Sequence, residues 1–202
     1  MASVNPFDSD LIRNAGALWR EATTSPFLDS LGAGTLPEEA FARWLAQDYL
    51  FAKNLVGFQA IVLAKSRRDC HGPLIAGLAA LDGELGWFER HAARLGVDLE
   101  VRPHPVCQGY CDLLMRAAYS HPLGVLLAML YGVEVSYLAA WSALEPKGPY
   151  AEFIERWSNP GFAAYVDSLR ELAGRYPHEG RQAAFNRVLE AERDFWRMSW
   201  GG

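Results

Sequence analysis

The sequence predicts an all-α protein, a single-domain helical bundle of about seven to eight helices. Apolar residues recur at helical spacing along most of the 202 residues, whereas the alternating pattern typical of strands is scarce. Glycines and prolines divide the chain into segments of helical length. There is no internal repeat, low-complexity tract or long linker, so we expect residues 1–202 to form one domain.

The first predicted helix begins after Asp8 and Ser9, residue types that commonly cap helices, and its apolar positions are spaced to form one face. A glycine-rich turn follows at residues 31–34. The next segment, Thr35-Leu-Pro-Glu38, has the pattern of a capping box, with a carboxylate three residues after the cap. It is therefore expected to start a long helix.

Prolines and glycines also set the limits of the later helices. Gly96 is expected to stop the third helix, and Arg102-Pro-His-Pro105 to form a linker, because two closely spaced prolines disfavour helix. The segment Asn159-Pro-Gly161 separates two further helices. The ranges predicted for the helices after the first are 37–65, 73–95, 106–119, 122–144, 150–157, 162–172 and 179–200.

Composition and charge narrow the classes of function. Half of the residues are hydrophobic and the formal net charge is −5, which favours a globular fold and gives no electrostatic basis for binding nucleic acid or an anionic membrane. Residues 124–143 approach the length of a membrane span, but the central Glu134 indicates a buried helix of a bundle. Cys70, Cys107 and Cys111 form no CxxC pair, and we expect a cytoplasmic protein.

Two acidic residues interrupt the apolar faces of predicted helices. Asp48 lies within an apolar stripe of the second helix, and Glu192 lies within a stripe of the last helix. In a purely structural interpretation, Asp48 sits at the edge of its stripe and pairs with Arg43 or Lys53. The apolar members of the two stripes are Trp44, Phe51, Leu55 and Phe58, and Phe185, Leu189 and Trp196.

A third acid, Glu134, is the only formally charged side chain between Arg116 and Glu145. Burying an ionised carboxylate without partners is costly, so such a group must be hydrogen-bonded, paired or protonated. No Lys or Arg lies within a helical turn, so its partner must come from another segment, a water molecule or a ligand. A buried structural acid and an acid that faces a ligand are the two interpretations, and the second is the more specific.

A set of motifs that covers nearly the whole chain resembles, in its order, the TenA/thiaminase II family. The motifs are Ser25-Pro-Phe-Leu28, Gly34-Thr-Leu-Pro37, Phe41-Ala-Arg-Trp-Leu-Ala-Gln-Asp-Tyr49, Tyr110, Tyr150 with Trp157, and the ending Glu192-Arg-Asp-Phe-Trp-Arg-Met198. The resemblance implies a single TenA-like domain with a heme-oxygenase-like all-α fold. It also implies hydrolysis of substituted aminopyrimidines in thiamin salvage, without a cofactor, by a homo-oligomer (tetramer or dimer).

The resemblance further implies roles for the residues that match these motifs. Asp48 would bind the exocyclic amine of the pyrimidine, and Glu192 would contact the edge of the ring. Tyr110 and Tyr137 would donate hydrogen bonds. A carboxyl group suits such a ligand because it accepts from an amine and, when protonated, donates to a ring nitrogen. The residues implied to line the ring pocket are Phe51, Trp157 and Phe195.

The chain departs from thiaminase II members at the nucleophile. Their Cys stands four residues before the helix Tyr, a position that is Val133 here when counted from Tyr137, and Phe51 stands where they typically carry Tyr. The chain is therefore similar to the Cys-less branch called TenA-E. We expect acid–base catalysis in which Glu134, with Glu192 and Asp48, activates water and protonates the leaving amine. Repulsion among these three carboxylates should raise at least one pKa towards neutrality.

Two other functions are alternatives. Glu84 and His91 lie two helical turns apart on one face, a spacing suited to a metal, and with Glu134 they resemble part of the ligand set of heme-oxygenase-like di-iron oxidases. The later part of the chain lacks the matching His, because Glu171 stands four residues after Asp167, and we predict no metal site. The second alternative is a pyrimidine-binding or regulatory protein without turnover. The expected partner is a small-molecule aminopyrimidine, with neither nucleic acid nor membrane.

Overall fold

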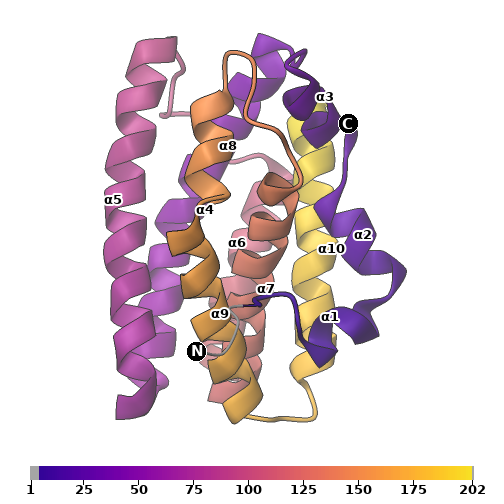
Figure 1. Cartoon of the computed structure of the whole chain (residues 1–202). Helices are drawn as coiled ribbons and strands as arrows, with labels where there is room; N and C mark the ends of the chain where they lie inside the picture. The colour runs from indigo at the N-terminus through magenta and orange to yellow at the C-terminus, as the bar shows by residue number, and fades with distance from the viewer. Residues whose placement is uncertain (1–4, 202) are drawn as a thin grey trace.

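Every regular element in residues 5–201, the part of the chain that the computed structural model describes, is helical, and the all-α prediction is confirmed. The long helices lie side by side, with α5 at one edge and α10 at the other (Figure 1). The helices in chain order are α1 (Asp10–Ala15), α2 (Ala17–Thr23), α3 (Pro26–Ala33), α4 (Glu38–Lys65), α5 (His71–Leu95), α6 (Pro105–Ser120), α7 (Leu123–Ser142), α8 (Ala151–Trp157), α9 (Pro160–Arg175) and α10 (Arg181–Trp200). A short 3-10 turn at Arg68–Cys70 precedes α5.

The N-terminal region contains more helices than the sequence predicts. Ser9 caps α1 as predicted, because its hydroxyl oxygen accepts a hydrogen bond from the N–H of Leu11 at 3.2 Å. The single first helix is wrong, however, since Gly16 has a φ of 58° and divides it into α1 and α2. The prediction also lacks α3, which is capped by Ser25 and has Pro26 in its first turn. The number of helices in residues 5–201 is therefore larger than the expected seven to eight.

The predicted capping box before α4 does not form. The N-cap of α4 is Pro37, which offers no side-chain hydrogen bond. The N–H of Thr35 instead donates to the carbonyl of Ser30 at 2.9 Å, next to the left-handed Gly34. Thr35 thus completes the C-terminal turn of α3 and is not available to α4. In contrast, Gly96 ends α5 in the left-handed conformation, as predicted.

Helix α7 is the centre of the bundle. It packs against α10, α9, α2, α8, α4 and α6, and α9 passes in front of part of it in Figure 1. By length and apolarity it is the one described helix that meets the criteria for a membrane span, but 83% of its most apolar window is buried within the bundle. Its apolar sequence is accounted for by burial on all sides.

A cluster of aromatic side chains fixes one side of this core. Trp44 of α4 is fully buried and lies 5.3 Å from Trp141 of α7 and 5.8 Å from Trp157 of α8, measured between ring centroids. Tyr137 packs edge-on against Trp157 at 5.4 Å. Because large rings in close contact have few alternative rotamers, this cluster gives the adjacent part of the bundle a rigid wall.

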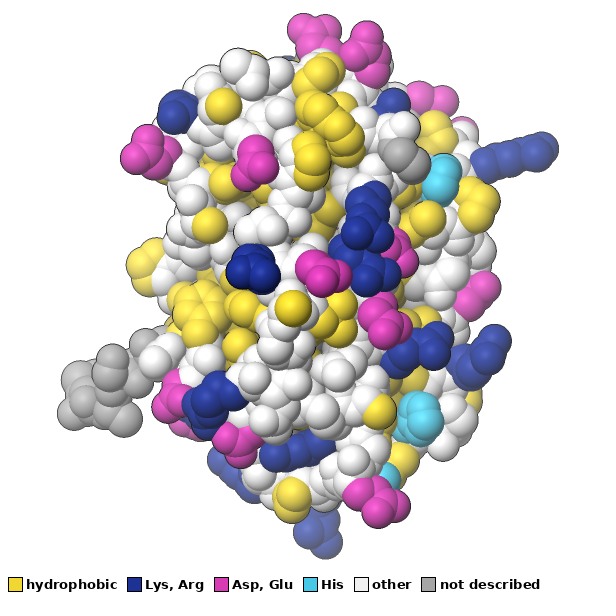
Figure 2. Space-filling view, turned by 90° about the vertical axis from the view of Figure 1, so that its right-hand side faces the viewer, with side chains coloured by type: hydrophobic (Ala, Val, Ile, Leu, Met, Phe, Trp, Pro, Cys, Tyr) yellow, Lys and Arg dark blue, Asp and Glu magenta, His cyan; other side chains and the backbone are white. Residues whose placement is uncertain are grey.

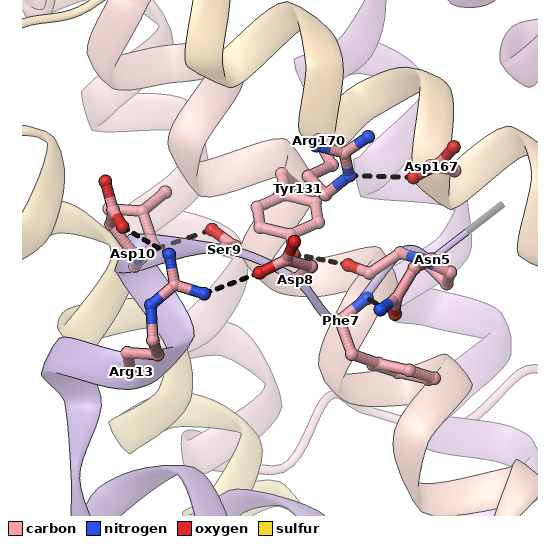
Figure 3. Close-up of polar contacts among 11 residues, drawn as sticks. Asn5, Phe7, Asp8, Ser9, Asp10, Arg13, Tyr131, Asp167 and Arg170 are labelled. Carbon is pink, nitrogen blue, oxygen red and sulfur yellow. Dashed lines mark hydrogen bonds and ion pairs between the residues drawn. The ribbon is translucent and has the colours of Figure 1, made fainter. Parts of the chain in front are cut away.

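The N-terminal segment is tied to α7 across the outside of the bundle (Figure 3). The hydroxyl of Tyr131, a buried residue of α7, donates to the carbonyl of Pro6 at 2.6 Å. Beside it, Arg13 forms ion pairs with Asp8 and Asp10. This segment is consequently ordered by one buried hydrogen bond and by exposed ion pairs that contribute little each.

Charged side chains of both signs are mixed on the face of the bundle that includes α1, α2 and α10 (Figure 2). Arg193 of α10, for example, pairs with Glu21 of α2 and with Asp194. Interspersed charges of this kind cancel one another within a short distance, so this face carries no field of a single sign.

A close approach of helices α4, α5 and α9 requires a glycine at position 77. Gln59 of α4 is fully buried; it donates to the carbonyl of Leu74 at 2.9 Å and accepts from the Tyr165 hydroxyl at 3.3 Å. A Cβ atom added to Gly77 of α5 would collide with both the Gln59 amide and the Tyr165 hydroxyl. Both groups are held by hydrogen bonds, so neither moves aside freely.

We therefore predict that Gly77→Ala destabilises the protein by about 1–3 kcal/mol, because the added methyl group overpacks a buried site. Gly83→Ala on the same helix is the matched control, since a Cβ there meets nothing within 4 Å. Its higher helix propensity should leave stability unchanged or raise it by about 0.5–1 kcal/mol. Urea unfolding of the two variants measures the difference, and equal stabilities would contradict the close approach.

Candidate functional site

Three acidic side chains enter the interior of the bundle from separate helices. Asp48 of α4, Glu134 of α7 and Glu192 of α10 are 6%, 7% and 4% exposed, respectively. The purely structural partners considered for Asp48 are engaged elsewhere. Arg43 donates to a backbone carbonyl of α10 at 2.9 Å, and the ammonium group of Lys53 lies over a tyrosine ring. Among residues 5–201, Asp48 is therefore an interior acid without a cationic partner.

The three acids line two small adjoining cavities, with volumes of about 40 and 10 Å³. The first, here the Glu134 chamber, is lined by Asp48, Phe51, Ala52, Leu55, Leu81, Glu84, Val133, Glu134, Tyr137, Trp157 and Phe162. The second, here the Glu192 chamber, is lined by Asp48, Phe51, Tyr110, Tyr137, Glu192 and Phe195. Asp48, Phe51 and Tyr137 belong to both. The structure thus brings together every residue that the sequence analysis assigned to the site.

Tyrosine hydroxyls hold two of the acids. The hydroxyl of Tyr137 donates to Oδ2 of Asp48 at 2.7 Å, and the hydroxyl of Tyr110 donates to Oε1 of Glu192 at 2.6 Å. Glu134 differs, since no hydrogen bond to its carboxyl group occurs among residues 5–201. Asp48 and Glu192 are consequently fixed in place, whereas the Glu134 carboxyl group is free to bind what enters its chamber.

Aromatic rings form the walls of the Glu192 chamber. Phe51 of α4 lies 4.5 Å from Tyr110 of α6 and 6.0 Å from Phe195 of α10, between ring centroids. All three side chains are buried. Flat rings with carboxyl groups at their margins are suited to a planar heteroaromatic ligand, because stacking supplies contact area and the carboxyl groups fix orientation.

Burial raises the pKa of all three acids. The pKa of Glu134 is raised to about 8, first by loss of hydration and then by the charges of Glu84, Glu192 and Asp48. The pKa of Asp48 is also raised to about 8 by burial, although its hydrogen bond from Tyr137 acts in the opposite direction. The pKa of Glu192 is raised to about 8 for the same reason. The expected rise is confirmed, but burial, and not mutual repulsion, is its largest cause.

The sequence analysis did not assign Glu84 to this carboxyl cluster. Glu84 lines the Glu134 chamber, where its Oε2 accepts a hydrogen bond from Nε1–H of Trp157 at 3.2 Å and lies 4.0 Å from Nη2 of Arg156. The signal was present, because Glu84 lies one turn from the buried Leu81 and Phe88 on an apolar stripe of α5. It is a fourth acid at the same site.

The Glu84–His91 metal pair considered from the sequence is not supported. His91 faces away from the chamber: Nε2 contacts Glu152 of α8 at 3.0 Å, and Nδ1 contacts the carbonyl of Trp87 at 2.9 Å. Asp167, near the expected later ligands, forms an ion pair with Arg170 at 2.7 Å. Across the described residues, no three His, Cys, Asp or Glu side chains are grouped closely enough to hold a metal ion. The donor set for a di-iron centre is therefore not assembled.

Val133, which the sequence resemblance places at the position of the family's Cys, lines the Glu134 chamber. Cys70, Cys107 and Cys111 are free and buried, and none of them lines either chamber. Cys107 lies against the backbone of α4, where its thiol donates to the carbonyl of Gln47 at 3.4 Å. Within residues 5–201, no thiol faces the space in which a substrate would bind.

A sequence model of the TENA/THI-4/PQQC family matches residues 12–202. The chain belongs to this family. Among TenA relatives, a probable bifunctional TENA-E protein from Glycine max is 31% identical over 207 residues, covering 91% of this chain and 89% of that protein. An aminopyrimidine aminohydrolase from Halalkalibacterium halodurans is 23% identical, covering 96% of this chain and 95% of that protein.

The fold comparison agrees with the family assignment. The structure of a TenA homologue from Pyrococcus furiosus has a TM-score of 0.84 and 27% sequence identity to this chain, covering 95% of this chain and 96% of the homologue. The expected heme-oxygenase-like fold is therefore confirmed. In this TenA-family chain the placement of the predicted site residues is a structural fact, whereas their catalytic and binding roles stay predictions.

The raised pKa values predict that folding stability falls as the pH rises from about 5 to about 8. Between the usual carboxyl pKa near ~4 and the folded value of about 8, the native protein binds more protons than the unfolded chain. The stability that these protons provide is present at the acidic end and is lost as the carboxyl groups ionise. Each group contributes a slope of at most about 1.4 kcal/mol per pH unit, which urea unfolding at several pH values measures.

The variant Glu134→Gln isolates one of these groups, and its stability should fall less steeply with pH, by about 1 kcal/mol per unit. Glu145→Gln is the control, because the Glu145 side chain is 86% exposed, and its slope should equal that of the wild type. Identical slopes for Glu134→Gln and the wild type would show that Glu134 ionises as an ordinary carboxyl group.

Proposed function

We propose that this protein hydrolyses substituted aminopyrimidines that arise from thiamin degradation, by carboxyl acid–base catalysis without a Cys nucleophile. The observation that carries the proposal is the convergence of Asp48, Glu134 and Glu192 on an aromatic cavity that no thiol faces. The names of the relatives from Glycine max and Halalkalibacterium halodurans support the same activity.

The groups that line the Glu192 chamber and its boundary suit the chemistry of an aminopyrimidine ring. A carboxyl group that keeps its proton donates to a ring nitrogen and accepts from the neighbouring exocyclic amine, so it pairs with both through one planar contact. Asp48 and Glu192 offer two such groups, fixed by Tyr137 and Tyr110. Phe51 and Phe195 would contact the ring, and Trp157 would cover the substituent on the side of the Glu134 chamber.

Glu134 is placed to act on the substituent. In its protonated form it gives a proton to the amine nitrogen while the bond between the methylene carbon and this nitrogen breaks and ammonia leaves. As a carboxylate it then takes a proton from the water whose oxygen bonds to the methylene carbon, which restores the acid and yields the hydroxymethyl product. With an N-formyl substrate the water oxygen adds to the formyl carbon instead, and formate is released.

The remaining parts of the proposal concern the assembly and its setting. We propose a cytoplasmic homo-oligomer, tetramer or dimer, that takes a small-molecule aminopyrimidine as its ligand and uses no cofactor, nucleic acid or membrane. Three free cysteines are compatible with a reducing compartment, and the oligomer rests on the family resemblance. Light scattering coupled to size-exclusion chromatography measures the number of subunits.

A ligand-binding protein without turnover would use the same cavity, and product release separates it from the enzyme. Incubation with a small panel of 5-aminomethyl- and 5-formamidomethyl-pyrimidines should release ammonia or formate together with the hydroxymethyl- or aminomethyl-pyrimidine. Binding of these compounds with no product from any of them would favour the non-catalytic function.

Glu134→Gln should keep the fold but lower turnover of 5-aminomethyl-pyrimidine substrates by roughly 100-fold or more, because the amide neither donates a proton to the amine nor accepts one from water. Ammonia release measures the turnover, and thermal unfolding at a pH of about 6 checks the fold. Glu145→Gln should retain wild-type activity. Near-wild-type turnover by a folded Glu134→Gln variant would exclude this role.

A further inference from the structure

Glu84 stands between the Glu134 chamber and a groove on the surface of the bundle. The groove is formed by α5, α8 and α9, and it shares Glu84, Trp157 and Phe162 with the Glu134 chamber. Arg156 and Tyr165 belong to the walls of the groove. Glu84 therefore faces the interior acids on one side and a charged, open region on the other.

The partners of Glu84 differ from those of the other acids. Its Oε2 accepts from the indole N–H of Trp157 at 3.2 Å and lies 4.0 Å from the guanidinium group of Arg156. The same guanidinium group lies over the Trp87 ring, 4.6 Å from the centroid, which fixes its position. In the described part of the chain, the side-chain donors to Asp48 and Glu192 are the neutral hydroxyls of Tyr137 and Tyr110. Glu84 is thus the acid of the site that is best placed to carry a negative charge.

Burial still raises the pKa of Glu84, but Arg156 and Trp157 oppose that rise. Its charge in turn raises the pKa of Glu134 more than those of the other acids do. Tyr137, on the same helix as Glu134, is bound to Asp48. The titratable and charged groups on the other helices that act on Glu134 or on Glu84 are Asp48 of α4, Glu84 of α5, Tyr110 of α6, Arg156 of α8, Tyr165 of α9 and Glu192 of α10.

We propose that Glu84 is a positioning residue that keeps the proton on Glu134 until the leaving amine takes it. An ionised Glu84 in the same chamber repels a second negative charge, so Glu134 remains the neutral acid that the departure of the amine requires. Once that proton has moved to the nitrogen, the same repulsion makes the Glu134 carboxylate a stronger base towards water. Glu84 keeps its charge throughout. This inference rests on the proposed function, because it gives Glu84 a part in that hydrolysis.

The pH profile of kcat/KM tests this role. Replacing Glu84 by Gln removes the charge and lowers the pKa of Glu134, so the limb on which activity falls with rising pH should move to lower pH by about one unit. A merely structural effect would reduce activity without moving this limb. Glu155→Gln is the matched control, since Glu155 is an exposed acid of the same groove outside the chamber, and its limb should match that of the wild type.

A second variant keeps the test open if Glu84→Gln fails to fold. Glu84→Asp retains the charge but withdraws it by one methylene group, so the limb should lie between those of the wild type and Glu84→Gln. A limb that stays at the wild-type position in folded Glu84→Gln overturns the proposal. If only Glu84→Asp folds, a limb at the wild-type position in that variant overturns the proposal.

An infrared titration provides a readout that does not depend on turnover. The C=O band of the protonated Glu134 carboxyl group is identified by its loss in Glu134→Gln, and it should disappear about one pH unit lower in Glu84→Gln than in the wild type. If the band shifts in Glu84→Gln but the wild type releases no product from any aminopyrimidine, the proposed hydrolase function is overturned and the effect of Glu84 on the Glu134 carboxyl group remains. If the wild type is active but neither the limb nor the band moves in Glu84→Gln, the Glu84 proposal alone is overturned.

Discussion

The site depends on carboxyl groups held where their charge is disfavoured. Asp48, Glu134 and Glu192 are buried among aromatic and aliphatic side chains, and the loss of hydration is the largest cause of their raised pKa values. Tyr137 and Tyr110 donate to Asp48 and Glu192 and offset only part of this loss. Because burial outweighs these hydrogen bonds, the acids retain protons near neutral pH. A neutral carboxyl group donates as well as accepts and has a proton to give, and both the binding and the chemistry proposed for the cavity follow from this state.

Such acids require a frame that does not relax around them. If the helices moved apart, water would enter, the carboxyl groups would be solvated, and their pKa values would return towards ordinary carboxyl values. Here the buried helix α7 carries Glu134, and the tryptophan cluster of Trp44, Trp141 and Trp157 packs beside it. Trp157 belongs to both the core and the chamber wall, and its N–H reaches Glu84. Close packing of the core thereby fixes the positions of the acids.

Sequence spacing was sufficient for the fold class and for the three acids, because helical periodicity alone decides whether a residue such as Asp48 lies on an apolar face. Spacing says nothing about which faces meet. Glu84 met the same criterion, but its pairing with His91 suggested a metal site, and only the folded chain shows that His91 is held by Glu152 of α8. Helix ends failed for a related reason. Thr35 has the capping pattern, yet the end of α3 uses its N–H, and competition between adjacent turns is not encoded in the pattern itself.

Val133, where the sequence resemblance places the family's cysteine, is consistent with the same electrostatics. A thiol at Val133 would share the chamber with Glu84, Glu134 and Asp48. The negative charge proposed for Glu84, together with the loss of hydration, would raise the pKa of that thiol and keep it protonated, whereas a cysteine nucleophile must be a thiolate. The field that holds a proton on Glu134 is therefore opposite to the field that a thiolate needs. A site of this kind therefore suits either acid–base catalysis by a protonated carboxyl group or attack by a thiolate, but not both. An apolar side chain at position 133 leaves room for the substrate carbon beside Glu134 without adding a group that must be charged.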